Sequence, residues 1–202
     1  MARTRNPHTD VPVSDPPVQG RPGLVVTAIG ILMALWCLGF AAVNVVFEVT
    51  GHFADGTSAH YAPGISVVDW LVAGLKVLGA VVALLSVARR PGFVSPAAVT
   101  VLVWAAFATL AVYVLGSVVE AVGMGLGLIG GVDQIGTRSV AYVLFFLLAA
   151  VGFGVLATSY SGRHPHGKRL VILGALGAPV VLGLLLLAIP ALLAAFGLLP
   201  GP

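Results

Sequence analysis

Charged residues are scarce in this sequence, since Asp, Glu, Lys and Arg together make up 8% of its 202 residues. Soluble domains average about 25% charged residues. A chain of this length that is also 59% hydrophobic could not hide its apolar surface from water within one core. An ordinary soluble fold is therefore excluded, and lipid is the expected solvent for most of the chain.

Cysteine and catalytic motifs are also nearly absent. Cys37 is the single cysteine, so no disulfide can form within the chain. Ser and Asp are too sparse for a persuasive hydrolase triad, and no nucleophile elbow, P-loop or zinc-protease motif occurs. The segment 125–130 matches G-x-G-x-x-G, but a dinucleotide site needs this motif inside a βαβ unit. Neither an enzyme nor a cofactor is expected.

Long apolar stretches are what the sequence does contain. Each is at least the roughly 20 residues that an α-helix needs to cross about 30 Å of hydrocarbon. The prediction is an all-α fold, a transmembrane helical bundle over residues 23–202. Its five predicted spans are residues 24–49, 67–88, 96–122, 139–160 and 170–199.

Positive charge gathers on alternate sides of these stretches. One set of gaps holds Arg3, Arg5, Arg21, Arg89, Arg90, Arg163, Lys168 and Arg169, and the other set holds Arg138. This is the positive-inside bias, which predicts a cytoplasmic N-terminus and a multi-pass protein of the cell membrane. The basic pI of about 9.4 follows from this topology, so nucleic acid is not an expected partner. The polar, proline-rich residues 1–22 are expected to form a disordered cytoplasmic tail.

Lys76 is the one basic residue inside an apolar stretch, close to the expected bilayer midplane. A lysine there costs at least about 2.5 kcal/mol by insertion scales, so it should face the bundle and have a partner. We predict an ion pair with Glu120, which lies at a similar depth on the next helix. Two interpretations stay open: a proton, ion or small-ligand site, and a salt bridge that fixes helix packing. The predicted buried polar cluster comprises Lys76, Glu120, Asn44, Ser117 and Tyr113, with Glu48 and Asp69 above it.

A weaker metal candidate lies in the expected external loop. His52, Asp55 and His60 have a spacing that can supply three metal ligands, as a catalytic zinc site requires. The simpler interpretation is a set of solvated loop residues, because the segment is rich in glycine.

One segment resembles a known family. The run Leu71-Val-Ala-Gly-Leu-Lys-Val-Leu-Gly-Ala-Val-Val-Ala-Leu-Leu85 is similar to the second helix of DoxX-like small membrane proteins, in which a short turn and another apolar helix follow. The resemblance covers the predicted helices at 67–88 and 96–122. That resemblance implies a quinone-associated redox partner. The richness in Ala, Val, Gly and Leu, with proline-rich ends, also resembles multi-pass membrane proteins of high-GC actinobacteria.

The leading prediction for function is a non-enzymatic bundle that acts as a subunit or scaffold beside another membrane protein or a second copy of itself. One alternative is a small permease or ion-conducting protein organised around Lys76 and Glu120. The other is the quinone-associated role that the DoxX-like segment implies.

Overall fold

The computed structural model describes residues 20–51, 62–88, 94–128, 136–164 and 167–196. All regular structure within these ranges is helical. The elements are α1 (Leu24–Val49), α2 (Ala62–Val87), α3 (Pro96–Gly125), α4 (Thr137–Arg163) and α5 (Lys168–Ala195). All five are long and apolar enough to cross a membrane. The predicted all-α fold with five spans is confirmed, and it supports an integral, multi-pass membrane protein.

The helix ends differ from the predicted spans by a few residues. Helix α2 begins at Ala62 and α4 at Thr137, before the apolar stretches start, and α4 continues to Arg163. The added residues of α4 are mostly polar, and those at the start of α2 include Pro63 and Gly64, so hydropathy alone does not count these turns as span. The predicted tail at 1–22 lies outside the described residues except for 20–22, as do residues 197–199 of the last predicted span.

The termini of α3 show how local sequence sets the helix bounds. At its start the Ser95 hydroxyl accepts a hydrogen bond from the backbone N–H of Ala98 at 3.2 Å, and proline follows at the first helical position. At its end Gly127 has a φ of 69°, and the N–H of Leu128 bonds to the carbonyl of Gly123 at 2.9 Å. This is a Schellman cap. The glycines of the G-x-G-x-x-G match therefore include the one that ends a helix.

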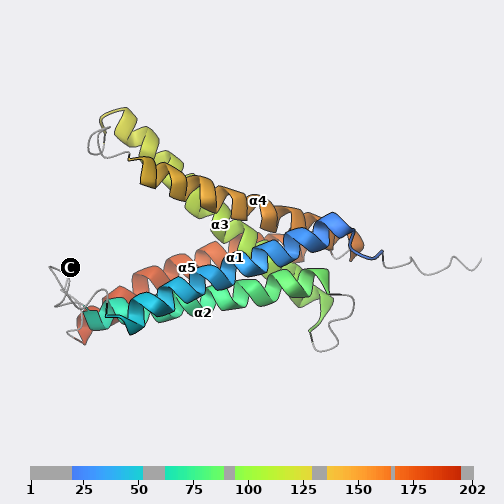
Figure 1. Cartoon of the computed structure of the whole chain (residues 1–202), viewed down its shortest axis with the longest axis horizontal. Helices are drawn as coiled ribbons and strands as arrows, with labels where there is room; N and C mark the ends of the chain where they lie inside the picture. Colours follow the sequence, from blue (N-terminus) through green and yellow to red (C-terminus); the bar gives the residue numbers. More distant parts are fainter. Residues whose placement is uncertain (1–19, 52–61, 89–93, 129–135, 165–166, 197–202) are drawn as a thin grey trace, which may run out of the picture.

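The helices form two antiparallel hairpins with a fifth helix against the second. Helix α1 packs along α2, and α3 packs along both α4 and α5, while the contacts of α1 and α2 with α4 are less extensive. The ends of α3 and α4 near Gly125 and Thr137 diverge from α1 and α2 (Figure 1). The opposite ends of these four helices lie close together. The bundle is therefore packed at one end and open at the other.

Buried side chains explain this asymmetry, because they gather at the packed end. Those of the core cluster come from the first half and middle of α1, the second half of α2, the first half of α3, and the middle and second half of α4. Most are small, which allows close helix packing in lipid. The core cluster is Met33, Ala34, Cys37, Ala80, Val82, Ala83, Val103, Ala149, Phe153, Leu156 and Ala157.

Two glycines mark the closest helix contacts. A Cβ atom at Gly152 of α4 would collide with the side chain of Met33 on α1. A Cβ atom at Gly174 of α5 would collide with the backbone carbonyl of Val101 on α3 and would lie 2.9 Å from the Cβ of Trp104. These two sites set how closely α4 and α5 approach their neighbours.

Candidate functional site

Polar contacts tie the helices together at the packed end. The Nη2 atom of Arg163 donates a hydrogen bond to the backbone carbonyl of Ser86 at 2.8 Å, which links α4 to α2. The guanidinium also lies over the ring of Tyr160, 5.5 Å from its centroid. Nearby, the indole Nε1 of Trp104 donates to the hydroxyl of Ser161 at 2.9 Å, which links α3 to α4. These contacts hold three helices together at this end.

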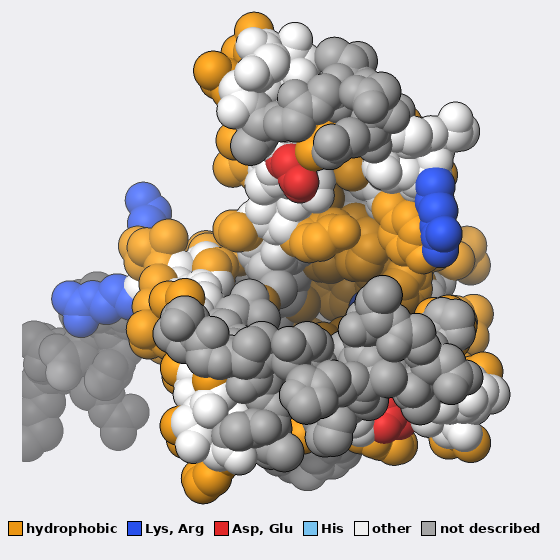
Figure 2. Space-filling model, turned by 90° about the vertical axis from the view of Figure 1, so that its left-hand side faces the viewer, with side chains coloured by type: hydrophobic (Ala, Val, Ile, Leu, Met, Phe, Trp, Pro, Cys, Tyr) orange, Lys and Arg blue, Asp and Glu red, His pale blue; other side chains and the backbone are white. Residues whose placement is uncertain are grey.

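The open end presents a hollow. Figure 2 looks into it from this end, with α3 and α4 above and the other helices below. Hydrophobic side chains form the floor of the hollow in this view. Ligand sites in proteins are typically concave and mostly apolar, with a few polar groups that fix orientation. The hollow is therefore the place to look for a functional site.

Five aromatic side chains from three helices meet between α1, α3 and α4, and we refer to them as the aromatic cluster. Ring centroids of contacting pairs lie between 4.5 and 5.5 Å apart, in tilted and edge-to-face arrangements. Such pairs contribute about 0.5–1.5 kcal/mol each beyond the area they bury. The cluster consists of Trp36 and Phe40 of α1, Tyr113 of α3, and Phe145 and Phe146 of α4.

Lys76 of α2 adds a positive charge to the aromatic cluster. Its Nζ lies 4.2 Å from the ring centroid of Phe40, 5.6 Å from that of Phe146 and 5.8 Å from that of Trp36. A cation–π contact contributes about 0.5–2 kcal/mol, whereas a lysine at membrane depth costs at least about 2.5 kcal/mol. Three such contacts are comparable in size with that cost, but they supply neither an opposite charge nor the hydrogen-bond acceptors that an ammonium group has in water.

Hydrogen-bond donors outnumber acceptors around Lys76. In the part of the chain that the structure describes, no carboxylate forms an ion pair with its ammonium group, whose contacts are the three ring faces. The indole Nε1 of Trp36 is buried and has no acceptor among the described residues. Lysine and tryptophan side chains offer donors only. An anionic oxygen beside Lys76 would give its ammonium group an acceptor.

The predicted ion pair between Lys76 and Glu120 is not formed. Glu120 is exposed and lies about two helical turns beyond Tyr113 on α3, in the part of that helix that diverges from α2 (Figure 1). We inferred similar depth by counting residues along each helix, which assumes that the helices stay side by side. The divergence separates them.

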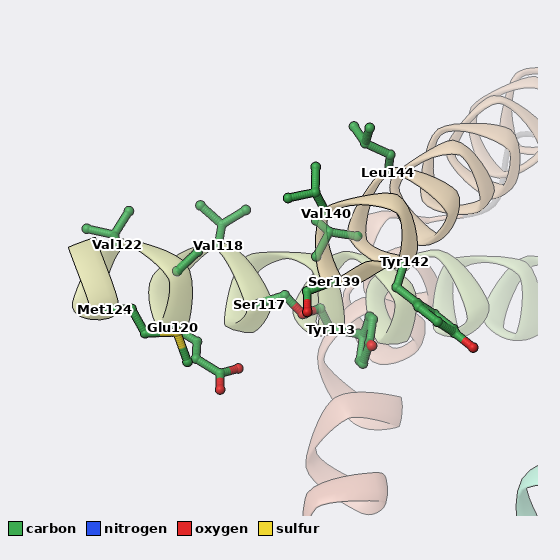
Figure 3. Close-up of a pocket in the computed structure, with 12 residues that line it drawn as sticks. Tyr113, Ser117, Val118, Glu120, Val122, Met124, Ser139, Val140, Tyr142 and Leu144 are labelled. Carbon is green, nitrogen blue, oxygen red and sulfur yellow. The ribbon is translucent and has the colours of Figure 1, made fainter. Parts of the chain in front are cut away.

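Glu120 instead lines a pocket between the ends of α3 and α4. The pocket has a volume of about 570 Å³. Glu120, Ser117 and Tyr113 of α3 project to the same side as Ser139 and Tyr142 of α4, while the side chains of Val118, Val122, Val140 and Leu144 project to the other (Figure 3). Tyr113 joins this pocket to the aromatic cluster, because its ring centroid lies 4.5 Å from that of Phe146.

The remaining predicted site residues form a separate group between α1 and α2. Ser66 donates a hydrogen bond to the carboxylate of Glu48, and Asp69 lies about one helical turn after Ser66 on α2. Asn44 is half-buried one helical turn before Glu48. The single cluster that the sequence predicts is thus divided into three places: Lys76 against the rings, the pocket at Glu120, and the group around Glu48.

The metal candidate cannot be placed. His52, Asp55 and His60 lie outside the described residues. Within the described ranges, no group of three His, Cys, Asp or Glu side chains is arranged to hold a metal ion.

Sequence reasoning missed the aromatic cluster. The signals were present, because Trp36 and Phe40 have the i, i+4 spacing that places both on one face of a helix, and Phe145 and Phe146 are adjacent. In an apolar chain such residues are easily interpreted as contacts with lipid. Only the packing of three helices brings them together around a lysine.

No protein-family model, curated protein or solved structure matches the chain. The segment 71–85 that resembles DoxX-like proteins lies in α2 and carries Lys76. Its relation to that family stays a prediction.

Proposed function

We propose that this chain is an integral plasma-membrane protein that binds a small, largely apolar molecule in its hollow, as a permease does in one of its states. The observation that carries the proposal is the ammonium group of Lys76, held against aromatic rings and without an acceptor among the described residues. Polar and ionisable residues at membrane depth are costly and commonly mark substrate or ion pathways.

The shape of the bundle agrees with a binding role. The pocket of about 570 Å³ does not include Lys76 in its lining, but Tyr113 joins it to the aromatic cluster. Its volume falls in the range of roughly 300–1,000 Å³ that is usual for sites of small molecules. One end of the bundle is held closed by Arg163 and by the bond from Trp104 to Ser161, and the other is open (Figure 2). A carrier must present its site to one side of the membrane at a time, and this asymmetry suits such a state.

Orientation is a separate part of the proposal, supported by the positive-inside bias. The bias places the packed end in the cytoplasm and the open end outside. Cysteines introduced at Thr50 and Gly136 should react with a membrane-impermeant maleimide in intact cells. Those at Ala88 and Gly167 should react only after lysis. The parent protein is the control, because its Cys37 is buried, and the reverse labelling pattern would contradict the orientation.

Binding can be tested on the full chain in lipid nanodiscs with three planar probes: 2-naphthoate, 1,4-naphthoquinone and 2-naphthylmethylammonium. We expect saturable binding of at least one probe, with one molecule per chain. Phe145→Ala should weaken that binding by about two- to tenfold, because it removes one aromatic contact. Phe196→Ala, on an exposed ring at the end of α5, should leave it unchanged.

The outcomes of this titration separate the alternatives. Absence of saturable binding by all three probes, above that of empty nanodiscs, would overturn the proposed function. Preference for the quinone would favour the redox role implied by the DoxX-like segment. If a bound probe also crosses the membrane of proteoliposomes that contain the protein, it is transported as well as bound.

A second candidate is the role of subunit, and α5 is the observation that favours it. In the most apolar part of this helix only 6% of the residues are buried. Its exposed side chains include Leu176, Val180 and Leu184. This face suits contact with a second membrane protein or a second copy of the chain as well as contact with lipid. Counting of single molecules by stepwise photobleaching in nanodiscs distinguishes a monomer from an assembly.

A further inference from the structure

Resting on the binding function proposed above, we propose that the ligand is a planar aromatic monoanion, an aryl carboxylate, whose carboxylate pairs with Lys76 while its ring lies against the aromatic cluster. Three features of the site define this class: the charge at its base, the shape of its walls, and the charges at its mouth.

Lys76 forms the base of the site and favours a ligand with an anionic oxygen acceptor. The ammonium group of Lys76 lies against three ring faces and forms no hydrogen bond or ion pair among the described residues. A carboxylate has two oxygens that accept hydrogen bonds and a charge that neutralises the lysine. A neutral amide would supply one acceptor and no neutralisation. The base therefore selects for charge as well as for hydrogen bonding.

The rings of the aromatic cluster form the walls of the site and favour a flat, apolar ligand. The rings of the aromatic cluster already lie 4.5–5.5 Å apart, the distance of direct contact, so no further ring fits between them. Phe145 and Tyr113 are nevertheless 42% and 47% exposed. A planar ligand can lie against these two rings and bring its carboxylate toward Lys76.

The mouth distinguishes one negative charge from two. The guanidinium of Arg138 lies over the ring of Tyr142, 5.9 Å from its centroid, and Tyr142 lines the pocket that also contains Glu120. A cation at the entrance raises the local concentration of anions. The carboxylate of Glu120 repels any second negative charge that the ligand would carry toward the mouth. This arrangement admits a monoanion and disfavours a dianion.

The test uses the full chain in nanodiscs with a matched pair of probes, 2-naphthoate and 2-naphthamide, which differ in charge but hardly in shape. The parent protein should bind the carboxylate about tenfold or more tightly than the amide. Lys76→Met should weaken binding of the carboxylate by a similar factor and change binding of the amide less than twofold. Lys76→Arg should retain most of the preference. Glu120→Gln should change binding of 2-naphthoate less than twofold, because its one charge is at Lys76, and should strengthen binding of the dianion 2,6-naphthalenedicarboxylate by about two- to fivefold, because the repulsion of its second charge is removed.

A melting curve in detergent for each variant establishes that the fold is intact, and the unaffected amide serves as an internal measure of an intact site. Equal binding of amide and carboxylate, or a preference kept by Lys76→Met, would overturn the proposed ligand class while leaving the binding function in place. Tighter binding of 2-naphthylmethylammonium than of 2-naphthoate would do the same. Failure of every probe to bind saturably would instead remove the binding function itself.

Discussion

Replacing Gly174 with alanine is expected to lower the free energy of unfolding by about 1–3 kcal/mol, the usual effect of overpacking. The added Cβ would collide with the carbonyl of Val101 and lie 2.9 Å from the Cβ of Trp104. A backbone carbonyl cannot rotate away as a side chain can, so α5 must move away from α3. Leucine at this position should prevent close docking of the two helices. Thermal unfolding in detergent, followed by circular dichroism, measures the change.

Gly183 on the same helix provides the matched control. A Cβ atom there meets nothing within 4 Å, and alanine is favoured over glycine in a helix by about 1 kcal/mol. Gly183→Ala should therefore leave stability unchanged or raise it slightly. If both alanine variants had the same effect, close approach at Gly174 could not be the cause.

Arg163→Met should have a comparable effect at the packed end of the bundle, with a loss of about 1.5–3 kcal/mol, the range for hydrogen bonds to charged groups. The carbonyl of Ser86 lies in the last turn of α2, where carbonyl groups have no partner within the helix. Arg163 donates to it at 2.8 Å, so its loss both breaks the link from α4 to α2 and leaves that carbonyl without its donor. Methionine keeps much of the apolar stem, so the measured loss reports mainly on the guanidinium.

The control for this variant is Arg169→Met. Arg169 is exposed in the first turn of α5, and substitutions at such positions usually change stability by less than about 0.5 kcal/mol. The two variants remove the same charge from the same end of the bundle. Equal melting temperatures for both would show that Arg163 contributes through general charge and not through its contact with Ser86.

The helices could be predicted from the sequence because they depend on local properties. A run of apolar residues such as 24–49 is both necessary and nearly sufficient for a membrane helix, and Ser95 followed by Pro96 indicates a helix start by its own chemistry. The first and last turns were harder to place, since Ala62 to Ser66 and Arg163 belong to helices without being part of an apolar run.

The site could be predicted only in part, for a geometric reason. Lys76 stood out because a charge in an apolar run is visible in the sequence alone. Its neighbours were not visible, because the angle between α2 and the end of α3 depends on packing elsewhere in the bundle. That packing involves residues as small as Ala83 and Gly152, which have no distinctive pattern in a chain so rich in alanine and glycine. Consequently Glu120 seemed the natural partner of Lys76, while Phe40 and Phe146 were overlooked.

The docking of α5 on α3 has a consequence for biosynthesis. The first four helices pair in chain order, as α1 with α2 and α3 with α4. Helix α5 instead packs mainly against α3, and not against α4, which precedes it in the sequence. Chains emerge from the ribosome at about 5–20 residues per second, so the part of α3 that holds Val101 and Trp104 is made seconds before Gly174. During that interval this face of α3 contacts lipid or the insertion machinery, and α5 must displace whatever covers it.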